Sequence, residues 1–194
     1  MKGTPKDILI VLLLLGLPIS VRPQSIITNR PALTDRGHVE DLTYSNSTLG
    51  FSYQLPRGFF VIQPFENFPS DSLCLMAADK RNGTPWRDRI LLVADTARHS
   101  WTISEYPDRL VHGFSAKGHI VVRHETYPLK IAGQNFFLID FQKTDDGKTV
   151  YQVFACTRLK GSVVSWMFTS LDENRVREMA TSINTVAFVS EKAP

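Results

Sequence analysis

The sequence predicts an α+β fold, a mostly antiparallel β-sheet with helices packed on it. Apolar or alternating runs of strand length recur between residues 49 and 169, and short turns separate many of them. Two further segments carry apolar residues at helical spacing. Because parallel neighbours need a long crossover connection, the short turns indicate that neighbouring strands run in opposite directions.

The first half of the chain contains four segments with strand character, residues 49–55, 59–63, 72–78 and 88–94. Apolar and polar residues alternate in the first segment, which is typical of a strand with one buried face. The third segment is apolar almost throughout and predicts a strand buried on both faces. The Asn82-Gly83 pair favours a tight turn before the fourth segment, because both residues tolerate positive φ.

The second half of the chain predicts a strand meander. Strand character is found in residues 119–126, 135–143, 149–159 and 162–169, and residues 129–131 with Gly133 are expected to make a short turn. Asp146-Gly147 and Lys160-Gly161 favour hairpin turns between the later segments. The sheet is therefore expected to grow by successive antiparallel hairpins.

Two amphipathic helices are predicted, one from an N-cap at Ser104 to Gly118 and one over residues 171–183. Ser170 and Glu173 form an S-x-x-E pattern, which predicts a capping box at the start of the second helix. The residues expected to be buried are Leu110, Val111 and Phe114 in the first helix and Val176, Met179, Ala180 and Ile183 in the second. Residues 186–189 form either a last short strand or a tail docked on the helix.

The N-terminus has the pattern of a signal peptide, which we assign to residues 1–25 with cleavage between 20 and 25. Lys2 and Lys6 precede an apolar run over residues 8–17. This run is shorter than the roughly 20 residues that span a bilayer, so an uncleaved anchor or a buried helix is the less favoured alternative. We therefore expect an exported protein, periplasmic or secreted, with no membrane insertion after cleavage.

Residues 26–38 mix proline, asparagine, glycine and charged residues without a sustained period, which predicts a linker or loose arm. Residues 39–190 are then expected to form a single α+β domain. This length is sufficient for one hydrophobic core.

The formal net charge of the chain is +3. Lys2, Lys6 and Arg22 against Asp7 give the leader a net charge of +2, so +1 remains after cleavage. Lysine and arginine do not occur in runs longer than two. A surface that follows a nucleic-acid backbone usually shows clustered positive charge, so we expect no nucleic-acid partner.

Cys74 and Cys156 are the two cysteines of the chain, and both lie in apolar runs with strand character. In an exported protein they could form one disulfide. The alternative is two buried free thiols that pack as small apolar groups. Their separation in sequence excludes a C-x-x-C redox pair, and there is no third thiol for a zinc ribbon.

Motifs for catalysis, metal binding or cofactor binding are not found, so no catalytic, metal-ligating or cofactor-binding residue is assigned. Residues 113–118 miss the G-x-S-x-G elbow of serine hydrolases, because Lys117 stands where the second glycine belongs. His119 and His124 are five apart on a predicted strand, so their side chains should point to opposite faces. Residues 145–147 lack the later ligands of a calcium loop and fit a hairpin turn instead. We expect no cofactor.

Trp86 and Trp101 lie in or beside predicted loops, with Arg87 and Arg89 close to Trp86 in sequence. Tryptophan and arginine are enriched at the energetic centres of protein interfaces. These four residues are the candidate partner surface. The alternative is that both tryptophans cover the edge of the core.

Residues 44–59, YSNSTLGFSYQLPRGF, resemble the opening of the PsbP-like and DcrB-like family, where a Gly-Phe pair and a later Pro-x-Gly-aromatic run form the first hairpin. The run Ile131-Ala132-Gly133-Gln134-Asn135-Phe136, the two long strands after it and the C-terminal helix are also similar to that family. The resemblance covers roughly residues 42–189. It implies an α/β/α-type sandwich in an exported protein that binds partners without catalytic residues, and it carries no functional residue over to this chain.

The leading expectation for function is an exported, non-enzymatic protein that binds a protein or an envelope component. The alternative is a small-ligand binder or a hydrolase whose site is assembled from residues distant in sequence. A concave pocket with converging Asp, Glu, His or Ser side chains would distinguish the alternative.

Overall fold

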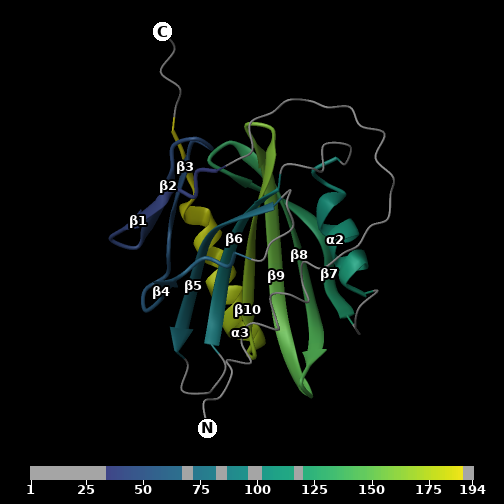
Figure 1. The fold of residues 1–194 in the computed structure, drawn as a ribbon. Coiled ribbons are helices and arrows are strands. Elements are labelled where there is room, and N and C mark those ends of the chain that lie inside the picture. Colours follow the sequence, from purple (N-terminus) through teal and green to yellow (C-terminus); the bar gives the residue numbers. More distant parts are fainter. Residues whose placement is uncertain (1–33, 67–71, 82–86, 96–101, 116–119, 190–194) are drawn as a thin grey trace.

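The structure is a computed structural model that describes residues 34–66, 72–81, 87–95, 102–115 and 120–189. A large antiparallel sheet has one helix on one face, and a second helix with a small sheet on the other (Figure 1). The α+β fold predicted from the sequence is confirmed. Among the described residues, no helix combines the length and apolar character needed to cross a bilayer.

The large sheet has seven strands in the order β4-β5-β6-β10-β9-β8-β7. Their bounds are β4 Phe60–Ile62, β5 Ser72–Arg81, β6 Arg87–Asp95, β7 Ile120–Ile131, β8 Gln134–Asp145, β9 Lys148–Leu159 and β10 Ser162–Ser170. The predicted meander is confirmed from β7 to β10, and it returns the chain so that β10 pairs with β6. The strand β7 is longer than predicted, because it continues through Pro128 on the open edge of the sheet.

The small sheet has the order β1-β2-β3-β11. Its strands are β1 His38–Glu40, β2 Thr43–Asn46, β3 Phe51–Gln54 and β11 Ala187–Phe188. The last of these confirms the short terminal strand that was one of the two expectations for residues 186–189. Strands β1 and β2 are too short for their alternation to be recognised in the sequence.

Residues 35–38, which the sequence places in the loose arm, are held against the small sheet. Asp35 accepts hydrogen bonds from the Gly37 backbone and the Thr48 hydroxyl, and the Tyr44 hydroxyl donates to the Arg36 carbonyl. Gly37 has φ +70, and a Cβ there would collide with the carbonyl oxygen of Ser45. Residues 35–38 therefore contact the small sheet through these hydrogen bonds.

Helix α2, Tyr106–Ser115, covers one face of the large sheet and buries Leu110, Val111 and Phe114 as predicted. Helix α3, Glu173–Thr181, packs on the other face and continues as a 3-10 turn, η1, over Ser182–Thr185. Its predicted buried residues, Val176, Met179, Ala180 and Ile183, are buried.

The predicted capping box at Ser170 and Glu173 is wrong. The N-cap of α3 is Asp172, whose carboxylate accepts from the backbone N–H groups of Asn174 and Arg175. The Ser170 hydroxyl instead donates to Asp88 at 2.7 Å and accepts from the Asp172 backbone N–H. The helix begins later than predicted because the Ser170 hydroxyl is bound to Asp88, so that Asp172 supplies the cap.

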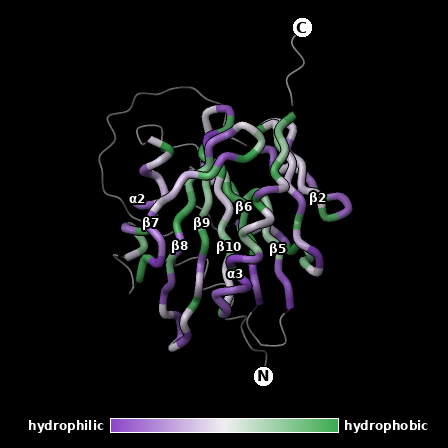
Figure 2. Tube along the Cα trace, turned by 180° about the vertical axis from the view of Figure 1, so that it is seen from behind, coloured by the Kyte–Doolittle hydropathy of each residue, from purple (hydrophilic) through white to green (hydrophobic). Residues whose placement is uncertain are grey.

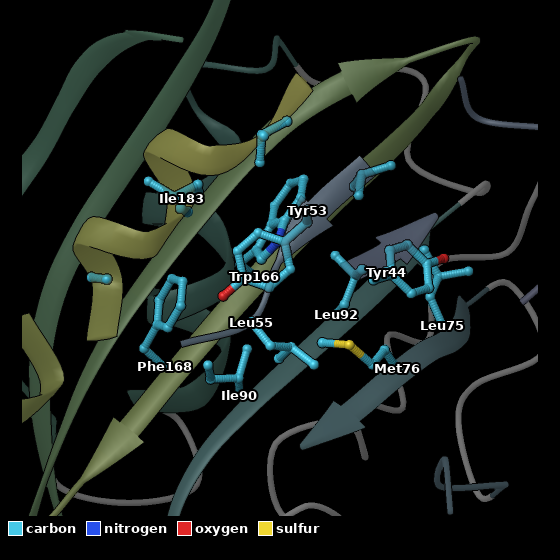
Figure 3. Packing of buried hydrophobic residues seen from close by; sticks show 14 of the residues in the cluster. Tyr44, Tyr53, Leu55, Leu75, Met76, Ile90, Leu92, Trp166, Phe168 and Ile183 are labelled. Carbon is cyan, nitrogen blue, oxygen red and sulfur yellow. The ribbon is translucent and has the colours of Figure 1, made fainter. Parts of the chain in front are cut away.

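The main core lies between the large sheet, the small sheet and α3. Trp166 of β10 is completely buried, and the rings of Phe51, Tyr53 and Phe136 lie 5.6, 6.1 and 5.6 Å from it. Figure 3 shows Tyr53 lying against Trp166. Figure 2 shows apolar residues along the upper parts of β8 and β9 and hydrophilic ones at the hairpin that joins them.

Cys74 on β5 and Cys156 on β9 are buried free thiols. Register pairs Cys74 with Val93, Val93 with Ser165 and Ser165 with Cys156, so one row crosses four strands. Three strand spacings of about 4.8 Å separate the two cysteines by about 14 Å. A disulfide needs Cα atoms within about 7 Å, so the disulfide alternative does not hold.

Candidate functional site

Two of the four residues of the candidate partner surface bind one buried carboxylate. Arg89 donates to Asp79 at 2.7 and 3.0 Å, and Arg87 donates to the same residue at 3.4 Å. Asp79 is completely buried, and the Arg89 side chain is 12% exposed and lies over the ring of Phe65. Arg89 is therefore part of the fold, whereas Arg87 keeps 38% of its side chain exposed. The two tryptophans, Trp86 and Trp101, lie outside the described residues.

A polar cluster that the sequence did not reveal lies where β7 and β8 face α3. The Asp140 carboxylate of β8 contacts His124 Nδ1 at 3.0 Å and accepts from the Tyr127 hydroxyl at 3.4 Å. Asp140 is 9% exposed, whereas the His124 side chain is 50% exposed. The buried carboxylate thus orients an accessible imidazole.

Two bulges in β7 explain how these side chains come together. The register with β8 shifts between Val122 and His124 and again between His124 and Tyr127. Each shift inserts one extra residue of β7 opposite β8, which interrupts the alternation of faces. As a result, two adjacent side chains of β7 face α3. Arg123 lies 3.6 Å from Glu173, and His124 lines the pocket together with residues of that helix.

A second charged group lies beside the first. Glu173 accepts from Arg177 at 2.9 Å within α3, and Arg123 of β7 lies 3.6 Å from the same oxygen. The three side chains are about a third to half exposed. They join the edge strand to the helix that forms the other wall of the site.

A pocket of about 370 Å³ opens between these elements, and we call it the His124 pocket. Its apolar lining is Leu129, Leu138, Val153, Ala180 and Ile183. Its polar lining is His124, Tyr127, Asp140, Arg177, Thr181 and Asn184. Apolar walls with a few convergent polar groups are typical of sites for small molecules.

A larger hollow of about 890 Å³ lies on the other face of the sheet, between α2 and β7. Three of its polar lining residues form exposed pairs, since Thr126 donates to Asp108 and Arg109 lies 3.6 Å from Glu105. It holds no carboxylate as deeply buried as Asp140 among its lining residues. The His124 pocket is therefore the stronger candidate.

Tyr127 is a permanent hydrogen-bond donor at neutral pH. Burial, followed by the negative charge of Asp140, raises the pKa of Tyr127 to about 12. The phenol therefore stays protonated, and both oxygens of Asp140 accept a hydrogen bond from within the cluster.

A histidine held by a carboxylate is an arrangement that can act as a general base. In the part of the chain that the structure describes, no serine or cysteine is hydrogen-bonded to His124 to serve as nucleophile. Thr181 lines the pocket, but its hydroxyl donates to the Glu178 carbonyl. The described residues also contain no group of three His, Cys, Asp or Glu side chains placed to hold a metal ion. His119 lies outside them.

One sequence signal could have found the site. Asp140 is the single charge in the run Asn135–Phe141, NFFLIDF, and its position puts it on the face shared with Phe136 and Leu138. A carboxylate on a buried face needs a partner. The identity of that partner depends on the bulges of β7, for which the sequence gives no local signature.

No family model matches the sequence, and no curated protein matches it. The fold is similar to that of cyanobacterial PsbP (CyanoP) from Synechocystis, with 11% identity, 75% of this chain and 91% of that chain covered, and a TM-score of 0.56. It is also similar to PA94 of Pseudomonas aeruginosa, a protein of unknown function and putative regulator, with 13% identity, coverage of 69% and 88%, and a TM-score of 0.43. A third similar structure is LpqN of Mycobacterium tuberculosis, which is involved in cell envelope biogenesis. Its sequence identity is 11%, 72% of this chain and 83% of that chain are covered, and the TM-score is 0.44. The similarity to CyanoP establishes the PsbP-like fold that the sequence resembles.

Proposed function

From a PsbP-like fold that carries an amphipathic pocket, we propose that this chain is an exported, non-enzymatic binding protein. Its ligand is an amphipathic component of the cell envelope, and it binds in the His124 pocket. The observation that carries the proposal is the buried Asp140 carboxylate, which orients His124 and Tyr127 at the rim of an apolar cavity. A group so placed can fix one polar end of a ligand while its apolar part contacts Leu138 and Ile183.

Export is supported by the leader pattern of residues 1–25, with basic residues ahead of a ten-residue apolar run. Cell fractionation with N-terminal sequencing of the mature protein tests it. A mature chain that starts between residues 21 and 26 in the exported fraction is the expected result, and a chain that keeps Met1 in the cytoplasm would contradict export.

The binding site is tested by titrating isotope-labelled protein with 1-octanol, a neutral amphiphile, and following the NMR signals. We expect shifts confined to the residues that line the pocket. Leu129→Trp fills the cavity and should abolish them, whereas Val61→Trp, on the opposite edge of the large sheet, should leave them unchanged. Shifts that are spread over the whole chain, or that survive Leu129→Trp, would contradict the site.

The His124–Asp140 pair also favours a second candidate function, hydrolysis of an ester with water activated by His124. Release of nitrophenol from 4-nitrophenyl octanoate distinguishes the two. If the protein only binds, nitrophenol is released at the same rate as in buffer alone, both for the wild type and for the His124→Gln variant. A rate that exceeds the buffer and falls in that variant would identify an enzyme.

For a protein partner we propose the surface around Trp86, Arg87 and Trp101. Arg89 is left out of the test, because its removal would leave the buried Asp79 carboxylate without its closest partner. Affinity recovery from the envelope fraction with Trp86→Ala and Arg87→Ala combined is the experiment. If every co-purifying protein is recovered unchanged, this surface does not bind a partner.

A further inference from the structure

We infer that the His124 pocket selects amphiphiles with a singly charged anionic headgroup, and that it holds them more tightly when His124 is protonated. The inference rests on the proposed function, because it names the ligand of the same site. The structural basis is the arrangement of six charged or titratable side chains at the pocket and beside it, four on the strands β7 and β8 and two on α3.

The first observation concerns the imidazole. An ionised carboxylate only accepts hydrogen bonds, so the contact of 3.0 Å to Asp140 places the ring hydrogen of His124 on Nδ1. In the neutral ring Nε2 is then an acceptor, and in the imidazolium it is a donor. Protonation therefore converts the accessible atom of His124 from one that repels an anion into one that binds it.

The second observation concerns Asp140. Its two oxygens already accept from His124 and Tyr127, and the residue is 9% exposed. It therefore offers little to a cationic headgroup. Its negative charge lies 3.0 Å from the ring of His124.

The third observation concerns the charge around the ring. Arg123 on β7 and Arg177 on α3 face Asp140 on β8 and Glu173 on α3, and Tyr127 stays uncharged. These four charges cancel, so the formal charge of the cluster is zero with neutral His124 and +1 with protonated His124. Arg177 lines the pocket together with His124, and its guanidinium has five N–H donors, of which the Glu173 contact uses one.

The fourth observation is the size of the cavity. At about 30 Å³ for each water, a volume of 370 Å³ corresponds to about a dozen non-hydrogen atoms of ligand. A chain of about eight carbons with a small anionic head has this size. Its tail would contact Leu129, Leu138 and Val153, and its head would lie between His124 and Arg177.

The test uses octane-1-sulfonate, whose head stays charged over the whole range, and 1-octanol as the neutral match. Calorimetry at about pH 5 and about pH 8 brackets the range in which histidine side chains change charge. We expect octane-1-sulfonate to bind roughly tenfold more tightly at the lower pH, the effect of one added charge-assisted hydrogen bond. The affinity for 1-octanol should not change with pH.

Two variants separate the contributions of His124 and Arg177 to binding of the anionic head. His124→Gln should remove the pH dependence and the proton uptake that accompanies binding, which is measured in buffers of different ionisation enthalpy. Arg177→Gln should weaken octane-1-sulfonate at both pH values and leave 1-octanol unchanged. His112→Gln replaces an exposed histidine on α2, across the sheet from the pocket, and should behave as the wild type.

Equal pH dependence for the two ligands, or a pH dependence that survives His124→Gln, would overturn the anion inference and leave the pocket as a binding site. If neither ligand binds, the proposed function fails as well. Circular dichroism of each variant establishes that a lost affinity does not reflect a lost fold.

Discussion

Arg87 and Arg89 show that two arginines on one carboxylate can differ greatly in what they contribute. Arg89 is mostly buried and makes two hydrogen bonds to Asp79, whereas Arg87 makes one longer contact from a more exposed position. Removing Arg89 leaves a buried negative charge without its main partner, and such a change destabilises proteins strongly. The exposed contact is worth much less.

We therefore predict that Arg89→Ala lowers the free energy of unfolding by about 3–5 kcal/mol. Arg87→Ala serves as the matched control and should lower it by about 1 kcal/mol or less. Urea denaturation measures both. Equal losses in the two variants would contradict the assignment of the main ion pair to Arg89.

Tyr127 makes the free energy of unfolding depend on pH in the alkaline range. Its pKa rises from 10.0 to about 12 on folding, because burial and then Asp140 disfavour the phenolate. The native state therefore holds this proton more tightly than the unfolded chain. The contribution is complete below about pH 10 and is lost as the pH rises through about 12.

Tyr127→Phe removes this contribution, so the free energy of unfolding should fall less steeply between about pH 10 and 12 than in the wild type. Urea denaturation at several pH values in this window measures the slope. Part of the slope should persist, because burial also raises the pKa of Tyr44 and Tyr53. An unchanged slope would contradict the role given to Tyr127.

Helix α3 illustrates how far local sequence patterns define an element. Its buried stripe was predicted correctly, because apolar residues at helical spacing must face the sheet. Its start was predicted wrongly, because the sequence offers two possible N-caps. Ser170 with Glu173 matches a capping box, and Asp172 is also a residue type favoured at the N-cap. The buried Asp88 carboxylate decides between them by binding the Ser170 hydroxyl, and this contact joins residues 82 apart in the sequence.

Asp172→Ala should therefore cost about 1 kcal/mol of stability, as expected for a lost N-cap. Asp172→Asn should be close to neutral, because asparagine caps about as well as aspartate. Thermal or urea denaturation distinguishes the two variants. If both lost the same amount, the charge of Asp172 and not its cap hydrogen bonds would be responsible.

The course of strand β7 could not be predicted from the sequence alone. The sequence predicts a strand that ends at Thr126, followed by a short turn at residues 129–131. The structure shows one strand with two bulges, and the bulges depend on pairing with β8. The candidate site could not be predicted for the same reason, because Arg123, His124 and Tyr127 share a face only after the strands have paired.

At the scale of the whole molecule, the meander and the two helices followed from turns and spacing, which are local properties. The distance between Cys74 and Cys156 did not, because it depends on the return of β10 to the side of β6. Strand order is set by packing over the entire domain. The sequence alone therefore does not determine whether two cysteines in different strands lie close together or far apart.

The two thiols should be inert in the folded protein. Both are buried, and burial raises the pKa of each, so little reactive thiolate forms. We predict that iodoacetamide labels neither cysteine in the native state and both after denaturation without a reducing agent. Mass spectrometry counts the added groups. Labelling that requires a reducing agent would show that the cysteines are bridged.

The bulged β7 also affects how the protein behaves at high concentration. It is an edge strand of the large sheet, and a regular edge can pair with the edge of another copy. Bulges, a proline and charged side chains all hinder such pairing, and β7 has Pro128, Arg123 and Lys130. The opposite edge, β4, is only three residues long. The irregularity that brings His124 to the pocket therefore also protects the protein from edge-to-edge aggregation.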